Sequence, residues 1–182
     1  MKKVDLSKYD NSWYKPGNIL LRVIWYYVNI CFFKNSFFTS SNFKVLILRL
    51  FGANVGKNLI IKNNVNIKYP WKLTIGDNCW IGEEVWIDNL DYVFIYNNVC
   101  ISQGAMLLCG NHNYKKYTFD LITSPISLMD GTWVGAKSIV CPGVTLFQNS
   151  ILTAGSLANQ DLEANYIYQG NPAKKNKLRQ IN

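Results

Sequence analysis

The single histidine, His112, is the side chain in this sequence best suited to general acid–base chemistry. It lies in the polar run Gly110-Asn111-His112-Asn113-Tyr114. An imidazole changes charge near neutral pH and can take the proton of a hydroxyl group that attacks an acyl donor. Cys109 offers an alternative, because a thiol beside a histidine could form an acyl-enzyme. The sequence shows no activating environment for this thiol, so we favour a packing role for it.

Carboxylate and amide side chains could support the histidine. Asp120 follows His112 in the same polar region and could orient its second ring nitrogen, although a backbone carbonyl would serve equally well. Asp88, Asn89 and Asp91 form another polar group, and they could hold the hydroxyl groups of an acceptor molecule. Asp and Asn are also common at turns, so an ordinary structural role for these three is an equal alternative.

An internal repeat of six residues indicates how these groups are positioned. Neither a helix nor an isolated strand has this period, but a solenoid with flat faces six residues long does. Smaller side chains stand four positions after most of the repeated residues, and glycine often follows them directly, so we expect Gly or Asn to supply the unusual turn angles. The repeated, inward-facing residues are Val55, Ile61, Ile67, Ile75, Ile81, Ile87, Ile95, Ile101, Leu107, Leu128, Val134, Val140, Leu146, Leu152 and Ala158.

Interruptions of the repeat define the other parts of the chain. The gap between Leu107 and Leu128 contains His112, and it predicts an extruded loop over residues 109–127 within a solenoid domain at 52–162. Residues 1–51 are expected to form a helical extension that caps the open end of the solenoid. Residues 163–182 read as a basic C-terminal tail.

The net charge of +8 favours an anionic partner. The basic residues do not follow the pattern of a nucleic-acid surface, so a phosphate-bearing cofactor or an anionic membrane is preferred. The apolar stretch from Ile19 to Phe33 is shorter than the roughly 20 residues that span a bilayer and contains Arg22. No signal peptide is expected, and five cysteines without metal-binding spacing indicate a reducing compartment. We therefore predict a cytoplasmic protein that could contact the inner face of the membrane.

Several short motifs resemble one protein family. The motifs are Trp80-Ile81-Gly82-Glu83, Asp88-Asn89, Cys100-Ile101-Ser102-Gln103-Gly104, Gly110-Asn111-His112-Asn113-Tyr114, Thr118-Phe119-Asp120-Leu121 and Gly170-Asn171-Pro172-Ala173-Lys174. Over roughly residues 50–175 they resemble the hexapeptide-repeat acyltransferases, in particular polysaccharide O-acetyltransferases of the colanic acid biosynthesis type. The resemblance implies a left-handed parallel β-helix, a homotrimer and acetyl-coenzyme A as co-substrate, with no metal.

The resemblance also implies roles for individual residues. His112 would deprotonate a sugar hydroxyl that attacks the thioester directly, with Asn111 and Tyr114 near the acceptor, which could be a sugar, a nucleotide sugar or a lipid-linked oligosaccharide. Trp133 and the backbone at Gly135, Ala136 and Ala154 would line the pantetheine arm, and Lys174 and Lys177 would meet the phosphates. Asn159-Gln160 departs from the Thr-Lys pair of many relatives, which puts one phosphate contact in doubt.

Other functions remain open at this point. A small free sugar or a xenobiotic could be the acceptor, or the chain could be a non-catalytic assembly subunit. A three-histidine zinc site of the kind found in γ-type carbonic anhydrases, which share the β-helical fold, is excluded because the chain has one histidine.

Overall fold

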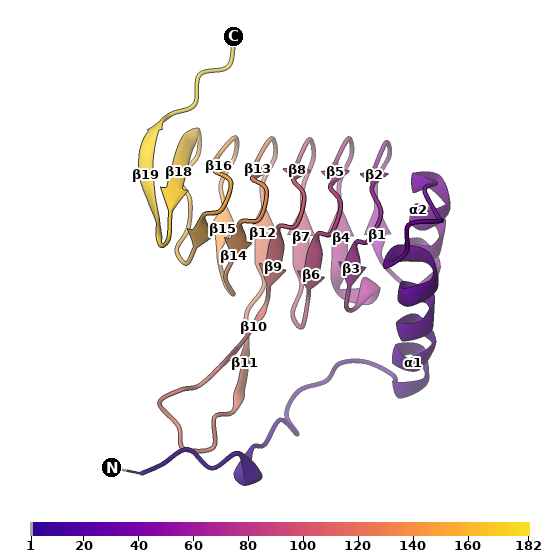
Figure 1. Ribbon diagram of the computed structural model, residues 1–182, viewed down its shortest axis with the longest axis vertical. Coiled ribbons are helices and arrows are strands. Elements are labelled where there is room, and N and C mark those ends of the chain that lie inside the picture. The colour runs from indigo at the N-terminus through magenta and orange to yellow at the C-terminus, as the bar shows by residue number, and fades with distance from the viewer. Residues whose placement is uncertain (1) are drawn as a thin grey trace.

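Three narrow parallel sheets wrap into a triangular prism in the computed structural model, which describes residues 2–182 (Figure 1). Sheet A contains β1 (Asn54–Val55), β4 (Leu73–Ile75), β7 (Val93–Ile95), β12 (Ile126–Leu128) and β15 (Thr145–Leu146). Sheet B contains β2 (Ile60–Ile61), β5 (Trp80–Ile81), β8 (Cys100–Ile101), β13 (Trp133–Val134), β16 (Ile151–Leu152), β18 (Tyr166–Gly170) and β19 (Ala173–Leu178). Sheet C contains β3 (Asn66–Ile67), β6 (Trp86–Asp88), β9 (Met106–Leu108), β14 (Ile139–Val140) and β17 (Leu157–Ala158). The prediction of a left-handed parallel β-helix is confirmed.

The repeated aliphatic residues form the core. Ile61, Ile81 and Ile101 occupy equivalent places in successive strands of sheet B, and each is buried. The smaller residue four positions further on is buried as well, as at Val85 and Ala105. Each coil therefore contributes one layer of side chains to a continuous apolar core.

The turns use glycine differently from the prediction. The residue in the left-handed region stands three positions after the aliphatic residue, as at Asn58 and Asn78, both with φ of 57°. Gly82, which follows Ile81 directly, has no positive φ. A Cβ at Gly82 would lie 2.8 Å from the backbone nitrogen of Gln103 in the next coil. This glycine therefore permits close stacking of coils and does not supply the turn angle.

Helices close the first end of the prism, as expected. α1 (Ile19–Val28) continues into a π-helical turn, η2 (Asn29–Phe33), and α2 (Ser41–Leu50) follows. Trp25 is the buried residue of α1, and it donates its indole N–H to the carbonyl of Ile67 at 2.8 Å. The buried Lys44 amine donates to the carbonyl of Lys62 at 2.8 Å. Both bonds satisfy carbonyl groups of the first coil.

The two ends of the chain differ from the prediction. Residues 2–16 do not join the helical cap: they leave it, form the short 3-10 helix η1 (Leu6–Lys8), and run towards the extruded loop (Figure 1). Residues 163–182 contain an antiparallel hairpin of β18 and β19, with β18 extending sheet B. They are therefore not merely a solvated tail. None of the helices in residues 2–182 combines the length and apolarity needed to cross a bilayer.

Candidate active site

An antiparallel hairpin carries His112 away from the prism. β10 (Gly110–His112) pairs with β11 (Leu121–Thr123), with His112 opposite Leu121. The hairpin leaves between β9 of sheet C and β12 of sheet A, and we call residues 110–125 the hairpin arm (Figure 1). At its base, the Thr123 hydroxyl donates to the Asp91 carboxylate at 3.2 Å. The predicted extruded loop is thus an ordered arm tied to the coil.

The imidazole of His112 is held on two sides. Its Nδ1 lies 2.9 Å from the carbonyl oxygen of Phe119, and the Phe119 ring stacks on it with centroids 4.5 Å apart and planes 6° apart. A carbonyl oxygen can only accept a hydrogen bond, so Nδ1 is the donor, and in the neutral imidazole Nε2 is the nitrogen with the free lone pair. No group in the described part of the chain bonds to Nε2. The contact at Nδ1 therefore fixes the orientation of the ring and leaves Nε2 without a partner among residues 2–182.

Phe119 itself has an unusual backbone. Its φ of 54° lies in the left-handed region, which is uncommon for a bulky residue and costs about 1–2 kcal/mol. The same backbone geometry presents both its carbonyl and its ring to His112. The sequence places Phe119 in a motif but does not predict its contact with His112. Nothing in a single sequence marks a non-glycine residue that will adopt a positive φ.

The structure corrects the role of Asp120. The partner of Nδ1 is the backbone carbonyl of Phe119, which was the stated alternative. The Asp120 carboxylate instead accepts from Lys116 Nζ at 3.0 Å. Hydrogen bonds from Thr118 and Lys116 hold the pKa of Asp120 below its ordinary value. Asp120 therefore holds the tip of the arm together and does not contact the imidazole.

Residues 2–16, which we call the N-terminal strap, form a second layer over the arm. The Asp5 N–H donates to the carbonyl of Tyr117 at 2.8 Å, and the Tyr9 ring lies 5.8 Å from the His112 ring at a tilt of 54°. Further along, the Tyr14 hydroxyl donates to the carbonyl of Leu90 at 2.7 Å. No motif signalled this contact, because the strap is separated from the arm by about 100 residues of sequence.

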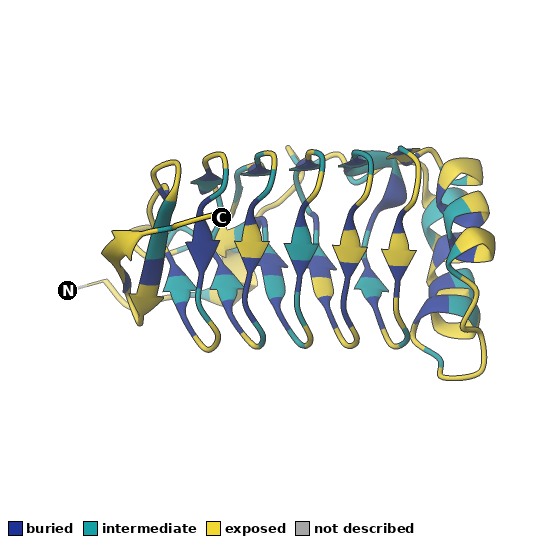
Figure 2. Cartoon of the chain, turned by 90° about the horizontal axis from the view of Figure 1, so that it is seen from above, coloured by how far each residue is buried: buried dark blue, intermediate teal, exposed yellow. Residues whose placement is uncertain are grey.

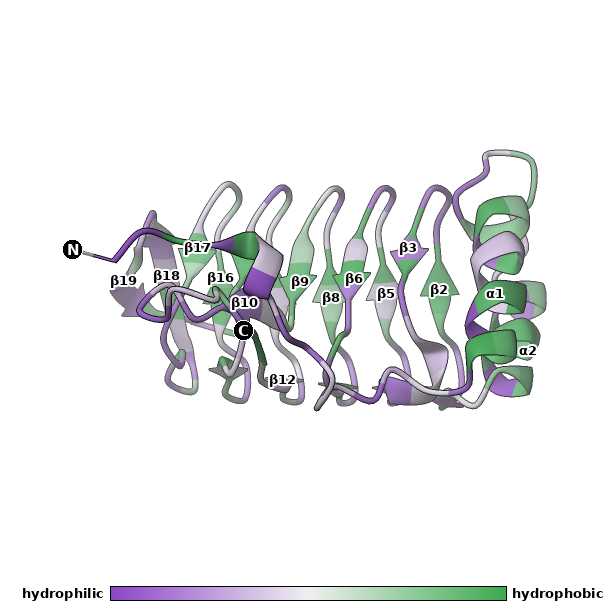
Figure 3. Cartoon of the chain, turned by 90° about the horizontal axis from the view of Figure 1, so that it is seen from below, coloured by the Kyte–Doolittle hydropathy of each residue, from purple (hydrophilic) through white to green (hydrophobic). Residues whose placement is uncertain are grey.

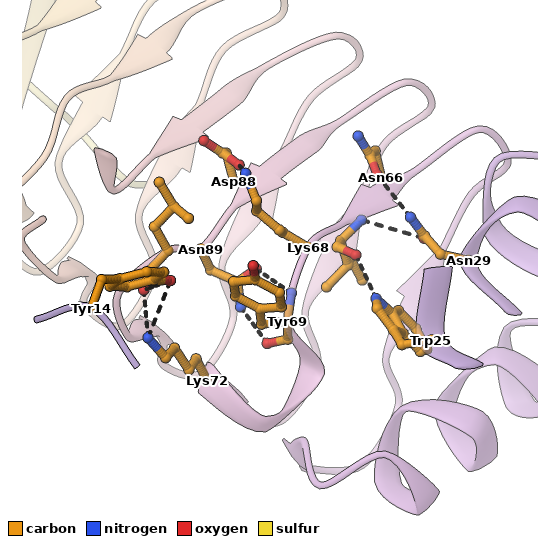
Figure 4. A network of polar contacts seen from close by, with 11 residues as sticks. Tyr14, Trp25, Asn29, Asn66, Lys68, Tyr69, Lys72, Asp88 and Asn89 are labelled. Atoms are coloured by element: carbon orange, nitrogen blue, oxygen red, sulfur yellow. Dashed lines mark hydrogen bonds and ion pairs between the residues drawn. The ribbon is translucent and has the colours of Figure 1, made fainter. Parts of the chain in front are cut away.

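The three predicted acceptor residues at the base of the arm have separate environments, and Figure 4 shows those of Asp88 and Asn89. Asn89 is 0% exposed, and its side-chain amide bonds the backbone N–H and carbonyl of Tyr69, so it ties two coils together and cannot touch an acceptor. Asp88 points outward from β6 and pairs with Lys68 at 2.9 Å. Asp91 accepts from the backbone of Tyr92 as well as from Thr123. Contrary to the prediction, Asn89 therefore does not bind the acceptor.

Asp88 also lines a cavity. This cavity has a volume of about 460 Å³ and lies between α1 and sheet C, with Arg22, Tyr26, Lys68 and Trp86 among its walls. Towards the tip of the arm, Asn111 and Tyr114 are exposed, and Asn111 accepts from the backbone N–H of His112 at 2.8 Å. Their position close to His112 in the arm keeps both as candidates for acceptor contact.

Trp133 stands on a different side of the prism from the arm. It begins β13 in sheet B, points outward with 44% of its surface exposed, and donates its indole N–H to Ser102 Oγ at 2.9 Å. Ser102 also lines a second cavity, of about 410 Å³, which follows the outer face of sheet B past Trp80. The arm leaves the corner between sheets C and A, opposite this face. One chain therefore does not bring His112 and Trp133 together.

The backbone groups predicted to bind a pantetheine arm are only partly free. The N–H of Gly135 donates to the carbonyl of Leu152 at 2.7 Å, and its carbonyl accepts from Ser138, so both groups are used in the coil. Within residues 2–182, neither Ala136 nor Ala154 donates its N–H to another group. Contrary to the prediction, the backbone of Gly135 is not free to bind a pantetheine arm, and this glycine instead allows neighbouring coils to stack closely. The N–H groups of Ala136 and Ala154 are still available as donors.

Lysines on β19 supply the free positive charge near the C-terminus. Lys175 is committed to Glu163 at 2.6 Å. Lys174 and Lys177 are exposed and form no ion pair within the described chain. These two therefore remain available to an anionic ligand.

Cys109 does not offer a competing nucleophile. It is completely buried in the core, and this burial raises the pKa of its thiol to about 12. A thiol with this pKa stays protonated near neutral pH and is unreactive. Among residues 2–182, no three His, Cys, Asp or Glu side chains lie close enough to bind a metal ion.

The chain is similar to known acetyltransferases both in sequence and in fold. No protein-family model matches the sequence. The chain is 34% identical over 160 residues to a protein of Escherichia coli K12 named as a colanic acid biosynthesis acetyltransferase, WcaF, with 88% of each chain covered. It is 29% identical over 140 residues to galactoside O-acetyltransferase of the same organism, covering 75% of this chain and 68% of the relative.

Solved structures share the fold. A hexapeptide-repeat acetyltransferase of Vibrio cholerae, VCA0836, superposes with a TM-score of 0.80 at 19% identity, over 89% of this chain and 92% of the other. Galactoside acetyltransferase in complex with coenzyme A gives 0.78 at 22% identity, over 87% and 80%. At these identities the likeness concerns the architecture.

Proposed function

This chain belongs to the hexapeptide-repeat acetyltransferases, and we propose that it moves an acetyl group from acetyl-coenzyme A to a sugar hydroxyl during synthesis of a surface polysaccharide. The observation that carries the proposal is the state of His112, with Nδ1 fixed by the Phe119 carbonyl and Nε2 free. The name of the WcaF relative supports a polysaccharide precursor as acceptor. Structures of two fold relatives bound to coenzyme A or acetyl-coenzyme A support the donor.

The proposed reaction is a direct transfer. Nε2 of His112 takes the proton of the acceptor hydroxyl as its oxygen attacks the carbonyl carbon of the thioester. The tetrahedral intermediate then releases the sulfur, which receives the proton from Nε2 and leaves as coenzyme A. The Phe119 carbonyl accepts from Nδ1–H throughout and stabilises the transient imidazolium. No covalent enzyme intermediate is required, in agreement with the buried, protonated Cys109.

The proposed donor site lies on the face that carries Trp133. Ala136 and Ala154 would donate their free N–H groups to the amide carbonyls of the pantetheine arm, with the Trp133 indole alongside. Lys174 and Lys177 would bind the phosphates as charge-assisted donors. For the acceptor, we propose Asp88 and Asp91 at the base of the arm and Asn111 and Tyr114 towards its tip.

We further propose that the working enzyme is a homotrimer. Because the arm and the Trp133 face lie on opposite sides of one prism, a complete site needs His112 from one subunit and Trp133 from its neighbour. Co-expression of His112→Ala and Trp133→Ala chains tests this directly. In random trimers about one quarter of the sites would be intact, whereas neither variant alone would have any. If mixing restored no activity, both residues would act within one chain and the shared site would be refuted.

Acceptor identity is tested by turnover. Wild-type protein is incubated with acetyl-coenzyme A and a panel of nucleotide sugars, free oligosaccharides and lipid-linked oligosaccharides, and free thiol and product mass are recorded. We expect acceptor-dependent release of coenzyme A and a product heavier by one acetyl group. If the enzyme preferred a free monosaccharide or a xenobiotic, its acceptor would be a small molecule and not a polysaccharide precursor. Absence of transfer to every acceptor, together with failure to bind acetyl-coenzyme A, would refute the enzyme proposal.

A further inference from the structure

The outer face of the helical cap is apolar. α1 and α2 lie side by side across the end of the prism, and their inner sides pack on the first coil through residues such as Trp25 and Leu48 (Figure 1). Many residues of the two helices are exposed (Figure 2), and many of them are hydrophobic (Figure 3). We call this surface the cap face, and its central residues are Leu20, Ile24, Leu46 and Leu50. Ile19 and Val23 are exposed as well, but they line the cavity between α1 and sheet C.

The loop between the two helices extends the cap face. Phe37 is 90% exposed, although phenylalanine is among the residues most often buried in folded proteins. The neighbouring Lys34 is exposed as well. On α1, Tyr26 and Tyr27 are exposed where the helix borders the cavity facing sheet C. Tyrosine has an apolar ring and a polar tip, which suits the boundary between water and lipid.

The net positive charge of the chain is concentrated in the segment of sequence that contains this face. Residues 11–76, which contain the cap and the first coil, hold nine Lys and Arg residues and no Asp or Glu. The rest of the chain holds ten Lys and Arg against eleven Asp and Glu, so it is close to neutral. The whole net positive charge of the protein thus arises from the part that carries the exposed apolar helices.

We propose that the cap face docks on an anionic lipid bilayer, with α1 and α2 lying in the plane of the interface. An apolar helix face with cationic surroundings has the chemistry that binds to the boundary between headgroups and acyl chains. Anionic lipids attract juxtaposed Lys and Arg residues, which supplies the charge complementarity. A second copy of the same face would bring like charges together, which disfavours self-association through it.

In this orientation the prism stands upright on the membrane. The orientation also determines which acceptor can reach the hairpin arm, an inference that rests on the proposed function. β3, β6 and β9 follow one another away from the cap, and the hairpin arm leaves after β9. Two steps of about 4.8 Å and a helix layer of about 10 Å place the arm roughly 20 Å above the lipid surface. An acceptor held at that height is an oligosaccharide attached to a lipid, and not a sugar free in solution.

Vesicle binding tests the docking surface with lipid alone. Purified protein is sedimented with vesicles of phosphatidylcholine and with vesicles that also contain phosphatidylglycerol. We expect wild type to bind the anionic vesicles preferentially, and the triple variant Leu20→Asn/Ile24→Asn/Leu46→Asn to bind them at least about tenfold more weakly. Lys34→Gln should weaken binding to anionic vesicles by about fivefold. Phe147→Asn is the matched control, because Phe147 is an exposed apolar residue away from the cap, and it should bind as wild type does.

Other outcomes overturn the proposal. Wild type that ignores anionic vesicles, or a triple variant that binds them equally well, would exclude lipid as the occupant. If sedimentation velocity showed that the triple variant forms a smaller assembly than wild type, the cap face would be a subunit contact. Acetyl transfer to a water-soluble acceptor should be unchanged in the triple variant. Vesicle binding without any acetyl transfer would refute the proposed function and leave the docking surface standing.

Discussion

Replacing Phe119 by glycine separates the two contacts that hold the imidazole of His112, the proposed base. Glycine adopts a φ of 54° without the cost that a side chain incurs, so the backbone and its carbonyl should stay at Nδ1 of His112. Only the stacked ring is lost. The variant therefore measures how much the Phe119 ring contributes to positioning the base, with the hydrogen bond left in place.

The size of the effect follows from the stacking geometry. A well-stacked aromatic pair contributes about 0.5–1.5 kcal/mol beyond its buried area, so loss of that positioning should lower kcat about two- to thirteenfold. KM values should change little, because Phe119 is not proposed to bind either substrate. Release of backbone strain offsets the lost contact, and the free energy of unfolding should change by less than about 1 kcal/mol.

Steady-state kinetics of the acetyl transfer provide the assay. Glu84→Gly is the matched control, because Glu84 has a φ of 58° at a turn of the coil and no contact with His112. Its kcat should equal that of wild type. An unchanged kcat for Phe119→Gly would show that the ring does not position the base. A fall as large as that of a variant lacking the imidazole would show that the backbone contact had been lost as well, and the reasoning would fail.

Three further predictions concern the coil, the thiol and the donor site. Gly82→Ala should lower the free energy of unfolding by about 1–3 kcal/mol in thermal denaturation, because the new Cβ would meet the next coil at Gln103; an unchanged Tm would contradict this. Iodoacetamide should not inactivate the enzyme at neutral pH, and Cys109→Ala should retain kcat, because the raised thiol pKa of about 12 leaves Cys109 protonated; inactivation abolished by Cys109→Ala would disprove it. Replacing Lys174 and Lys177 by glutamine should raise the KM for acetyl-coenzyme A roughly tenfold with kcat unchanged. If the KM of this variant equalled that of wild type, the phosphates of the coenzyme would bind elsewhere.

The repeat made most of the fold predictable. Because Ile61, Ile81 and Ile101 recur in phase with the coil, their spacing also anticipated which residues would be stacked and buried. The interruption after Leu107 likewise placed His112 outside the prism. These features depend on local periodicity, which a single sequence displays directly.

Contacts between distant segments were not predictable in the same way. Asn89 has a side chain typical of an exposed turn, yet its partner Tyr69 lies one coil earlier and buries it completely. The strap residue Tyr9 reaches His112 although no repeat or motif connects them. The choice of the Phe119 carbonyl over Asp120 depends on a positive φ that sequence does not reveal. Each case is decided by tertiary packing.

Comparison of wild type with His112→Ala tests the central claim most directly. Acceptor-dependent release of coenzyme A from acetyl-coenzyme A is measured for both proteins, and binding of acetyl-coenzyme A confirms that the variant is folded. Because Nε2 is proposed to be the general base, kcat should fall by about 10²–10⁴-fold while donor binding is retained. Equal kcat values for the two proteins would contradict the role of His112 and, with it, the proposed mechanism.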